Sequence, residues 1–155
     1  MYLFDTNIFY TLGHYFPSRF PTIWATLDEL VLRGEVESVR EVRREIERNC
    51  PFEHIEKWVK RNRDIFKTPT PEELAIVESI FREERFQALV RRENILKGLP
   101  VADPFLIAAG KAKRAVVVTM EKPTSGGARI PDVCRALRVR CINLEKCFQE
   151  LNIQY

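Results

Sequence analysis

The segment from Ala115 to Thr119 contains three consecutive valines and no charged side chain. A strand with one face in solvent alternates apolar and polar residues, so this uninterrupted apolar run predicts a strand that is buried on both faces. Strands of that kind belong to parallel sheets that are covered by helices. Shorter apolar segments at 1–4, 36–38 and 139–142 are separated by helical patterns. This alternation predicts an α/β fold with a parallel sheet.

The segments between these strands carry the apolar spacing and the end signals of helices. Gly34 follows one of them, and Thr70 to Glu73 supplies the cap, the proline and the early acids of a helix start. We expect helices at 6–15, 21–33, 39–50, 52–62, 70 to about 92, 103–113, 131–137 and 145–151. The 155 residues contain no repeat, linker or low-complexity tract, so we expect residues 1–155 to form one domain.

Acidic residues stand where the strands end. Asp5 comes directly after the strand at 1–4, Glu121 comes shortly after the valine strand, and Asp103 opens the apolar helix at 103–113. Ligands of open parallel sheets lie beyond the carboxyl ends of the strands. Clustered carboxylates repel one another and are costly to desolvate, so a fold that gathers them binds a hard divalent cation.

Glu45 is a further candidate ligand. The helix at 39–49 has an apolar face that is centred between Val42 and Ile46. Glu45 lies on the flank of that face, from which a side chain reaches inward, whereas we expect Glu41 to lie further toward solvent. The predicted site therefore has four acids: Asp5, Glu45, Asp103 and Glu121.

Each of these acids also has a structural explanation. Asp5 and Asp103 suit the N-cap position of the helices that follow them. Glu45 suits an ion pair within its own helix, and Glu121 suits an exposed loop. Asp132, at the start of the helix at 131–137, is an alternative to Glu121 as the fourth acid.

Basic residues are concentrated in one part of the chain. Residues 111–140 contain eight basic and two acidic residues, although the net charge of the whole chain is only +3. A basic rim beside an acidic pocket suits a polyanion that is cut with the help of a metal ion; a solvated arginine-rich surface is the other explanation. Three of these residues are candidates for phosphate contacts, namely Arg114, Lys122 and Arg129.

Several other classes of protein are disfavoured. The four cysteines form no C-x-x-C pair, so a structural zinc site is not expected. The position two residues after Asp5 is Asn7, where phosphatases of the haloacid dehalogenase type need a second aspartate. Gly126-Gly127 lacks the spacing of a phosphate-binding loop. With no signal peptide and no apolar stretch of membrane-spanning length, we expect a cytoplasmic protein with no membrane partner.

Four segments resemble the PIN-domain nucleases, and in particular the stand-alone VapC-like toxins of toxin–antitoxin pairs. They are Phe4-Asp5-Thr6-Asn7, Val42 to Ile46 with Glu45, Ala102 to Ala109 with Asp103, and Val117-Val118-Thr119 followed by an acid. The resemblance implies a three-layer α/β/α sandwich with a central, mostly parallel sheet. It also implies Mg²⁺ or Mn²⁺ held by Asp5, Glu45, Asp103 and a fourth acid, with RNA as substrate.

The chain departs from the common small toxin in three ways, one of which is the loop Lys122 to Ile130 with the segment Pro131 to Cys134 that follows it. The fourth acid is usually an aspartate, and here Glu121 is longer. A helical insert at about 52–97 is also long for this type of protein.

These observations lead to one hypothesis, an endoribonuclease that depends on Mg²⁺ or Mn²⁺ and hydrolyses RNA phosphodiester bonds. The four acids would hold the metal and orient water, and Thr6, Asn7 and Thr119 would act as hydrogen-bond donors around them. The resemblance adds a role as the toxin of a type II toxin–antitoxin pair, with a cognate antitoxin and a homodimer as expected partners. The alternative is a non-catalytic RNA-binding or protein-interaction domain on the same fold.

Overall fold

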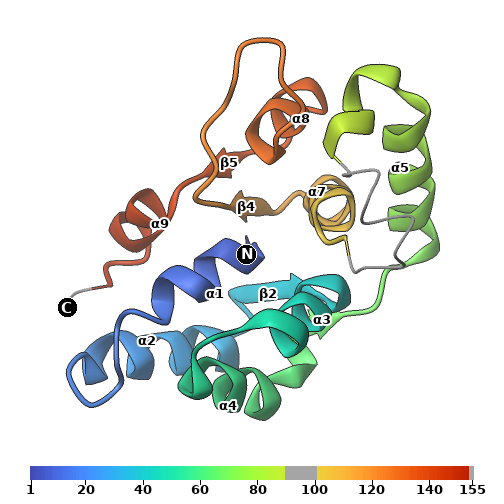
Figure 1. Cartoon of the computed structure of the whole chain (residues 1–155). Helices are drawn as coiled ribbons and strands as arrows, with labels where there is room; N and C mark the ends of the chain where they lie inside the picture. The colour runs from blue at the N-terminus through green and yellow to red at the C-terminus, as the bar shows by residue number, and fades with distance from the viewer. Residues whose placement is uncertain (90–100, 154–155) are drawn as a thin grey trace.

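The centre of the molecule is a sheet of five strands that all run parallel. The computed structural model describes residues 1–89 and 101–153. The strands lie in the order β3-β2-β1-β4-β5 (Figure 1). Their bounds are Tyr2–Phe4 (β1), Val36–Val39 (β2), Phe66–Lys67 (β3), Val116–Val118 (β4) and Cys141–Ile142 (β5). The predicted parallel α/β sheet is therefore confirmed.

Helices cover both faces of this sheet and complete a three-layer α/β/α sandwich. One face carries helices α1 to α4, and the other carries α7 with α5 and α8 packed against it (Figure 1). The bounds are Thr6–Leu12 (α1), Pro21–Leu32 (α2), Arg40–Asn49 (α3), Glu53–Arg61 (α4), Pro71–Arg82 (α5), Asp103–Lys113 (α7), Ile130–Ala136 (α8) and Leu144–Glu150 (α9). This division follows from right-handed crossovers, since the chain moves from β1 to β3 in one direction and from β4 to β5 in the other.

The segment at 52–97 contains a strand that the sequence did not indicate. β3 has only two residues, too few to show the alternation of a strand, and it forms because Ser38 and Val39 pair with Phe66 and Lys67. A 3-10 turn, η1 (Arg63–Ile65), precedes it. The helix expected to reach about residue 92 ends at Arg82 and is followed by a second 3-10 segment, η2 (Glu84–Leu89); the remainder of that prediction lies outside the described residues.

The order of the strands creates one special position at the carboxyl edge of the sheet. The chain leaves β1 toward β2 on one side, whereas β4 pairs with β1 on the other side. Two neighbouring strands whose connections diverge leave a crevice between them, and that crevice is where such sheets bind ligands. Phe4 pairs with Val118 in the register of β1 and β4, so Asp5 and Thr119 leave the sheet side by side at this point.

Helix α7 is deeply buried, and it packs directly on the sheet. Five consecutive residues from Leu106 to Gly110 are buried. The close approach needs a residue without a side chain at 110, because a Cβ there would lie 2.7 Å from Val117 Cγ2 and 3.0 Å from Val139 Cγ1. This contact fixes α7 against the sheet. No helix in the part of the chain that the structure describes is long and apolar enough to cross a membrane.

Gly110→Ala is expected to lower the free energy of unfolding by about 1–3 kcal/mol, because the new methyl group overlaps Val117 and Val139. Urea denaturation followed by circular dichroism measures this change. The double variant Gly110→Ala/Val117→Ala, which makes room for the methyl group, should be less destabilised than the sum of its two single changes. Simple additivity of the two effects would contradict the proposed contact.

Candidate metal centre

Asp5 is held in one orientation at the start of α1. It is buried, with 3% of its surface exposed. Its Oδ1 accepts a hydrogen bond of 2.7 Å from the Thr6 backbone N–H, and its Oδ2 accepts one of 2.8 Å from the Thr119 hydroxyl. Asp5 is thus the N-cap residue of α1, as its structural explanation required, and it is also directed into the crevice between β1 and β4.

The direction of the Thr119 hydroxyl follows from its neighbours. Its oxygen accepts hydrogen bonds from the Asn7 side-chain amide, at 3.0 Å, and from the Glu121 backbone N–H, at 3.1 Å. With both lone pairs of Thr119 occupied, its proton is directed to Asp5. Asn7 is fixed as well, because its Oδ1 accepts from the Met120 N–H at 2.9 Å. Asn7 and Thr119 were predicted to support Asp5. All three residues are therefore part of one hydrogen-bond network.

Glu45 reaches the same region from α3. Its Oε2 accepts a hydrogen bond from the Thr6 hydroxyl, and its Oε1 accepts one of 3.0 Å from the Ala102 backbone N–H. Thr6 follows Asp5, and Ala102 precedes Asp103, so Glu45 joins the segments that carry two of the other acids. Its carboxylate is held by these contacts, and no ion pair within α3 is formed by Glu45 in the described part of the chain.

One expectation for α3 is wrong. Glu41, expected toward solvent, is buried with 4% of its surface exposed, and it pairs with Arg40 at 2.8 Å. Helix α3 packs against β3 as well as β2. Its buried face is therefore broader than the apolar pattern indicated. Among the described residues, Glu41 makes no hydrogen bond with any of the four predicted acids.

Asp103 is the first residue of α7, and Ala102 occupies the N-cap position. Its charge is close enough to those of Asp5, Glu45 and Glu121 to be affected by all three. A cap role does not explain Asp103, because its side chain accepts no hydrogen bond from a later backbone N–H of the helix among the described residues.

Glu121 and Asp132 have different surroundings. The Oε2 of Glu121 accepts a hydrogen bond of 2.9 Å from the Ile130 N–H, and its charge acts on both Asp5 and Asp103. Asp132 accepts from the Thr124 N–H at 3.1 Å, the Thr124 hydroxyl at 3.1 Å and the Arg129 N–H at 3.2 Å. These contacts close the loop before α8. The geometry therefore favours Glu121 over Asp132 as the fourth acid of the cluster.

The electrostatics of the cluster are those of carboxylates brought together in a poorly solvated place. Burial raises the pKa of Asp5 to about 7; the hydrogen bonds from Thr119 and Thr6 lower it, and the charges of Glu121 and Glu45 raise it. Burial, and then the charges of Asp5, Glu121 and Glu45, raise the pKa of Asp103 to about 8. Burial also raises the pKa of Glu45. Near neutral pH this arrangement has a shortage of positive charge.

The chemistry of these donors fits a hard divalent cation such as Mg²⁺ or Mn²⁺. Carboxylate and hydroxyl oxygens are the ligands such ions prefer, and a cation would offset the repulsion that raises the pKa of Asp5 and Asp103. In the present conformation, no three histidine, cysteine, aspartate or glutamate side chains within residues 1–89 and 101–153 are grouped closely enough to hold one ion together.

The three basic residues predicted to contact phosphate lie at two different edges of the sheet. Lys122 and Arg129 belong to the loop after β4, on the side of the acids. Arg114 precedes β4 and therefore lies at the opposite edge. There it lines a cavity of about 630 Å³ together with Lys111, Arg138 and Arg140. Of the three residues, Arg114 is therefore the one that does not lie on the side of the acids.

Two donors of the site were not visible in the sequence, the backbone N–H groups of Ala102 and Ile130. Every residue except proline has such a group, so residue type carries no signal for it.

A scan against protein families assigns the chain. It belongs to the family described as Domain of unknown function (DUF4411), which matches residues 2–155. A search of curated proteins and a search of solved structures gave no match. Membership in the DUF4411 family therefore covers nearly the whole chain and carries no activity with it.

The stability of this DUF4411 protein without metal is expected to fall as the pH rises from about 5 to 8. The pKa of Asp5 and Asp103 is raised to about 7 and about 8, far above the ordinary value of an unfolded aspartate. Between the pKa of an unfolded aspartate and these raised values, the folded state binds more protons than the unfolded state. The stabilisation is therefore complete at low pH and is lost through pH 7–8.

Asp103→Asn should reduce the dependence of the free energy of unfolding on pH. It should also be more stable than the wild type at pH 8, by on the order of 1–2 kcal/mol. Urea denaturation in EDTA at several pH values measures both; an unchanged slope contradicts the assignment.

Millimolar Mg²⁺ or Mn²⁺ is expected to bind the wild type, and Glu121→Gln should weaken binding by at least about tenfold. Asp132→Asn is the matched control. It also removes one nearby negative charge, but that carboxylate accepts hydrogen bonds within the loop before α8. Titration calorimetry at pH 7.5 compares the three proteins. Loss of binding in Asp132→Asn with retention in Glu121→Gln would reverse the assignment of the fourth acid.

Proposed function

We propose that the protein is a metal-dependent endoribonuclease that hydrolyses RNA phosphodiester bonds. The observation that carries the proposal is the electrostatic cluster of Asp5, Glu45, Asp103 and Glu121 at the crevice where strand order reverses. A chain gains nothing in stability from gathering carboxylates that raise one another's pKa. The arrangement is useful when positive charge from a cation and a negatively charged substrate meet there.

The chain's own residues have definite parts in such a reaction. Asp5, Asp103, Glu45 and Glu121 would hold Mg²⁺ or Mn²⁺, which when bound supplies charge neutralisation at the phosphate and polarises water. Thr119 fixes Asp5 through its hydroxyl, and Asn7 fixes Thr119. Thr6 and the Ala102 N–H hold both oxygens of Glu45, which keeps that carboxylate directed at the crevice. These contacts reduce the reorganisation needed when the phosphate binds.

A polyanion is the substrate class that the surroundings suit. Lys122 and Arg129 stand on the loop that follows β4, and Lys122 is next to Glu121 in the chain. Positive side chains outside a cluster of acids attract a phosphate backbone and let the acids act on it through a cation. RNA, in place of another polyanion, is proposed from the resemblance to PIN-domain nucleases.

The finer part of the proposal is biological. We propose that the protein acts in the cytoplasm as the toxin of a type II toxin–antitoxin pair, with a cognate antitoxin and a homodimer as partners. This part rests on the resemblance of the Asp5, Glu45 and Asp103 segments to VapC-like toxins.

Purified wild-type protein is expected to cleave single-stranded RNA in Mg²⁺ or Mn²⁺ and to be inactive in EDTA. Asp5→Asn should lower the cleavage rate by about 100-fold or more while leaving RNA binding intact, because the side chain keeps its size and loses its charge. Asp28→Asn is a matched control, since Asp28 belongs to α2 and pairs there with Arg61 of α4 at 2.9 Å. Gel assays of cleavage and fluorescence anisotropy of RNA binding give the two measurements.

The same experiment separates the proposal from the non-catalytic alternative. A binding domain would bind RNA or a protein partner equally well in the wild type and in the Asp5→Asn variant, and neither protein would cleave RNA with any metal. For the toxin role, growth arrest on expression that Asp5→Asn relieves is the expected result. Cleavage without growth arrest would support the nuclease function and contradict the toxin role.

A further inference from the structure

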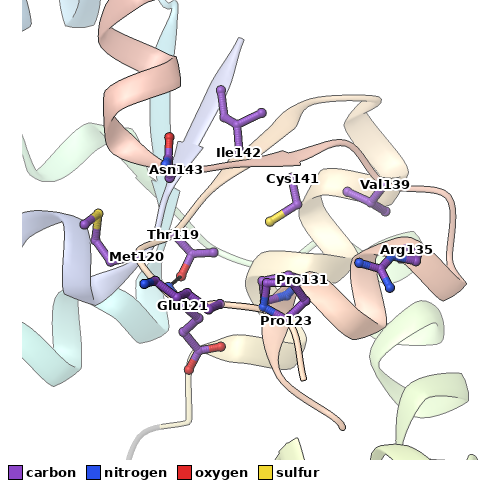
Figure 2. Close-up of a pocket in the computed structure, with 11 residues that line it drawn as sticks. Thr119, Met120, Glu121, Pro123, Pro131, Arg135, Val139, Cys141, Ile142 and Asn143 are labelled. Atoms are coloured by element: carbon purple, nitrogen blue, oxygen red, sulfur yellow. Dashed lines mark hydrogen bonds between the residues drawn. The ribbon is translucent and has the colours of Figure 1, made fainter. Parts of the chain in front are cut away.

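A cavity of about 460 Å³ opens beside the acidic cluster, between the segment after β4, helix α8 and the residues 139–143 around β5 (Figure 2). Its size is within the range of pockets that bind small molecules. One wall is the segment from Thr119 to Pro123, and the opposite wall is formed by α8 and the end of β5. Neither the family match nor the four acids explain why the fold leaves this space.

The cavity shares a wall with the proposed metal centre. Thr119 and Glu121 line it, and the same two residues contact or affect Asp5. A phosphate group at the acids is therefore adjacent to the mouth of the cavity.

The interior of the cavity has flat apolar surfaces. Pro123 comes from the loop after β4 and Pro131 from the first turn of α8, and Cys141 of β5 points toward the two prolines (Figure 2). The two proline rings provide rigid contact for a planar group. These apolar surfaces carry no hydrogen-bonding group that a ligand would have to satisfy.

The polar groups of the cavity are mainly donors. The Oδ1 of Asn143 accepts a hydrogen bond of 2.8 Å from the Lys146 N–H, which leaves its side-chain amide to donate. Arg135 is exposed and Lys122 is exposed at the cavity, and neither forms an ion pair with a residue in the described part of the chain. A ligand that matches this lining has a planar part with acceptor oxygens or nitrogens and at least one anionic group.

We propose that this cavity is a nucleotide subsite, in which one base of a single-stranded RNA packs against Pro123 and Pro131 while its phosphate meets Arg135 and Lys122. The placement next to the cleaved phosphate rests on the proposed nuclease function. A single-stranded chain presents unstacked bases that can enter a pocket, whereas a duplex keeps them stacked. The amide of Asn143 donates to an acceptor on the base edge, which makes this subsite a source of base preference.

Binding of a nucleoside 5′-monophosphate by the whole chain tests the subsite directly. Titrations in EDTA, with each of the four common monophosphates in turn, exclude a contribution from a cation at the acids. At least one nucleotide is expected to bind, and ribose 5-phosphate and inorganic phosphate should each bind about tenfold more weakly because they lack the base. Equal binding of the nucleotide and ribose 5-phosphate, or no binding of any of the four at millimolar concentration, overturns the proposal.

Two variants and one control variant assign the binding to this cavity. Arg135→Ala should weaken the nucleotide by about tenfold, since a charge-assisted contact to phosphate is lost. Arg19→Ala removes the same charge from an exposed position in the loop between α1 and α2 and should leave binding unchanged. Asn143→Ser retains a good N-cap for α9 while it removes the amide donor, so it should change the preference among bases with little effect on thermal stability. Full retention of nucleotide binding in both Arg135→Ala and Asn143→Ser overturns the assignment.

RNA oligonucleotides with a single abasic residue distinguish failure of the subsite from failure of the nuclease. Loss of the base next to the cleaved bond is expected to slow cleavage by about tenfold. Cleavage at the same rate for every abasic position would contradict the proposed subsite and support the nuclease function. Nucleotide binding by a protein that cleaves no RNA in any metal would support the subsite and contradict the nuclease function.

Discussion

The parallel pairing of β1 with β4 is the constraint on which the rest of this structure depends. Phe4 lies beside Val118, and the Asp5 N–H donates to the Val118 carbonyl at 3.0 Å, so the two strands end at the same level. Because the connections of these strands run to opposite sides, a crevice remains between their ends. The acidic cluster lies at that crevice, and the cavity lies beside it, next to β4, β5 and α8. A one-residue shift in this pairing would turn Asp5 and Thr119 away from each other.

A cluster of carboxylates opposes folding, and the surrounding hydrogen bonds compensate for part of that cost. Thr119 connects Asp5 with Asn7 and with the backbone of Glu121, and Glu45 connects the α1 segment with the start of α7. The acids are thus held by groups that come from four separate segments. Their raised pKa values show that the hydrogen bonds do not fully replace solvent or a counter-charge. This remaining imbalance is the physical reason for proposing a cation at the site.

Part of this arrangement was readable in the sequence because it follows from local rules. The valines of β4 are largely buried, and Asp5 follows an apolar strand, so both could be assigned to a parallel sheet and to its carboxyl edge. Glu45 accepts a hydrogen bond from the Ala102 N–H, whereas the expectation that Glu41 lies toward solvent is wrong. β3 was missed because a two-residue strand has no period, and its pairing with β2 also explains the burial of that face of α3.

The sequence by itself determined the class of fold and the chemical types available at the strand ends, because burial patterns and acidic residues are properties of short segments. Only the tertiary structure decided which of those residues meet. It directed Glu121 toward the cluster and assigned Asp132 to a loop, and it separated Arg114 from Lys122 by the length of β4. These outcomes depend on backbone donors such as the Ala102 and Ile130 N–H groups and on strand order. Neither is encoded in the identity of any single residue, because each arises from contacts between segments far apart in the chain.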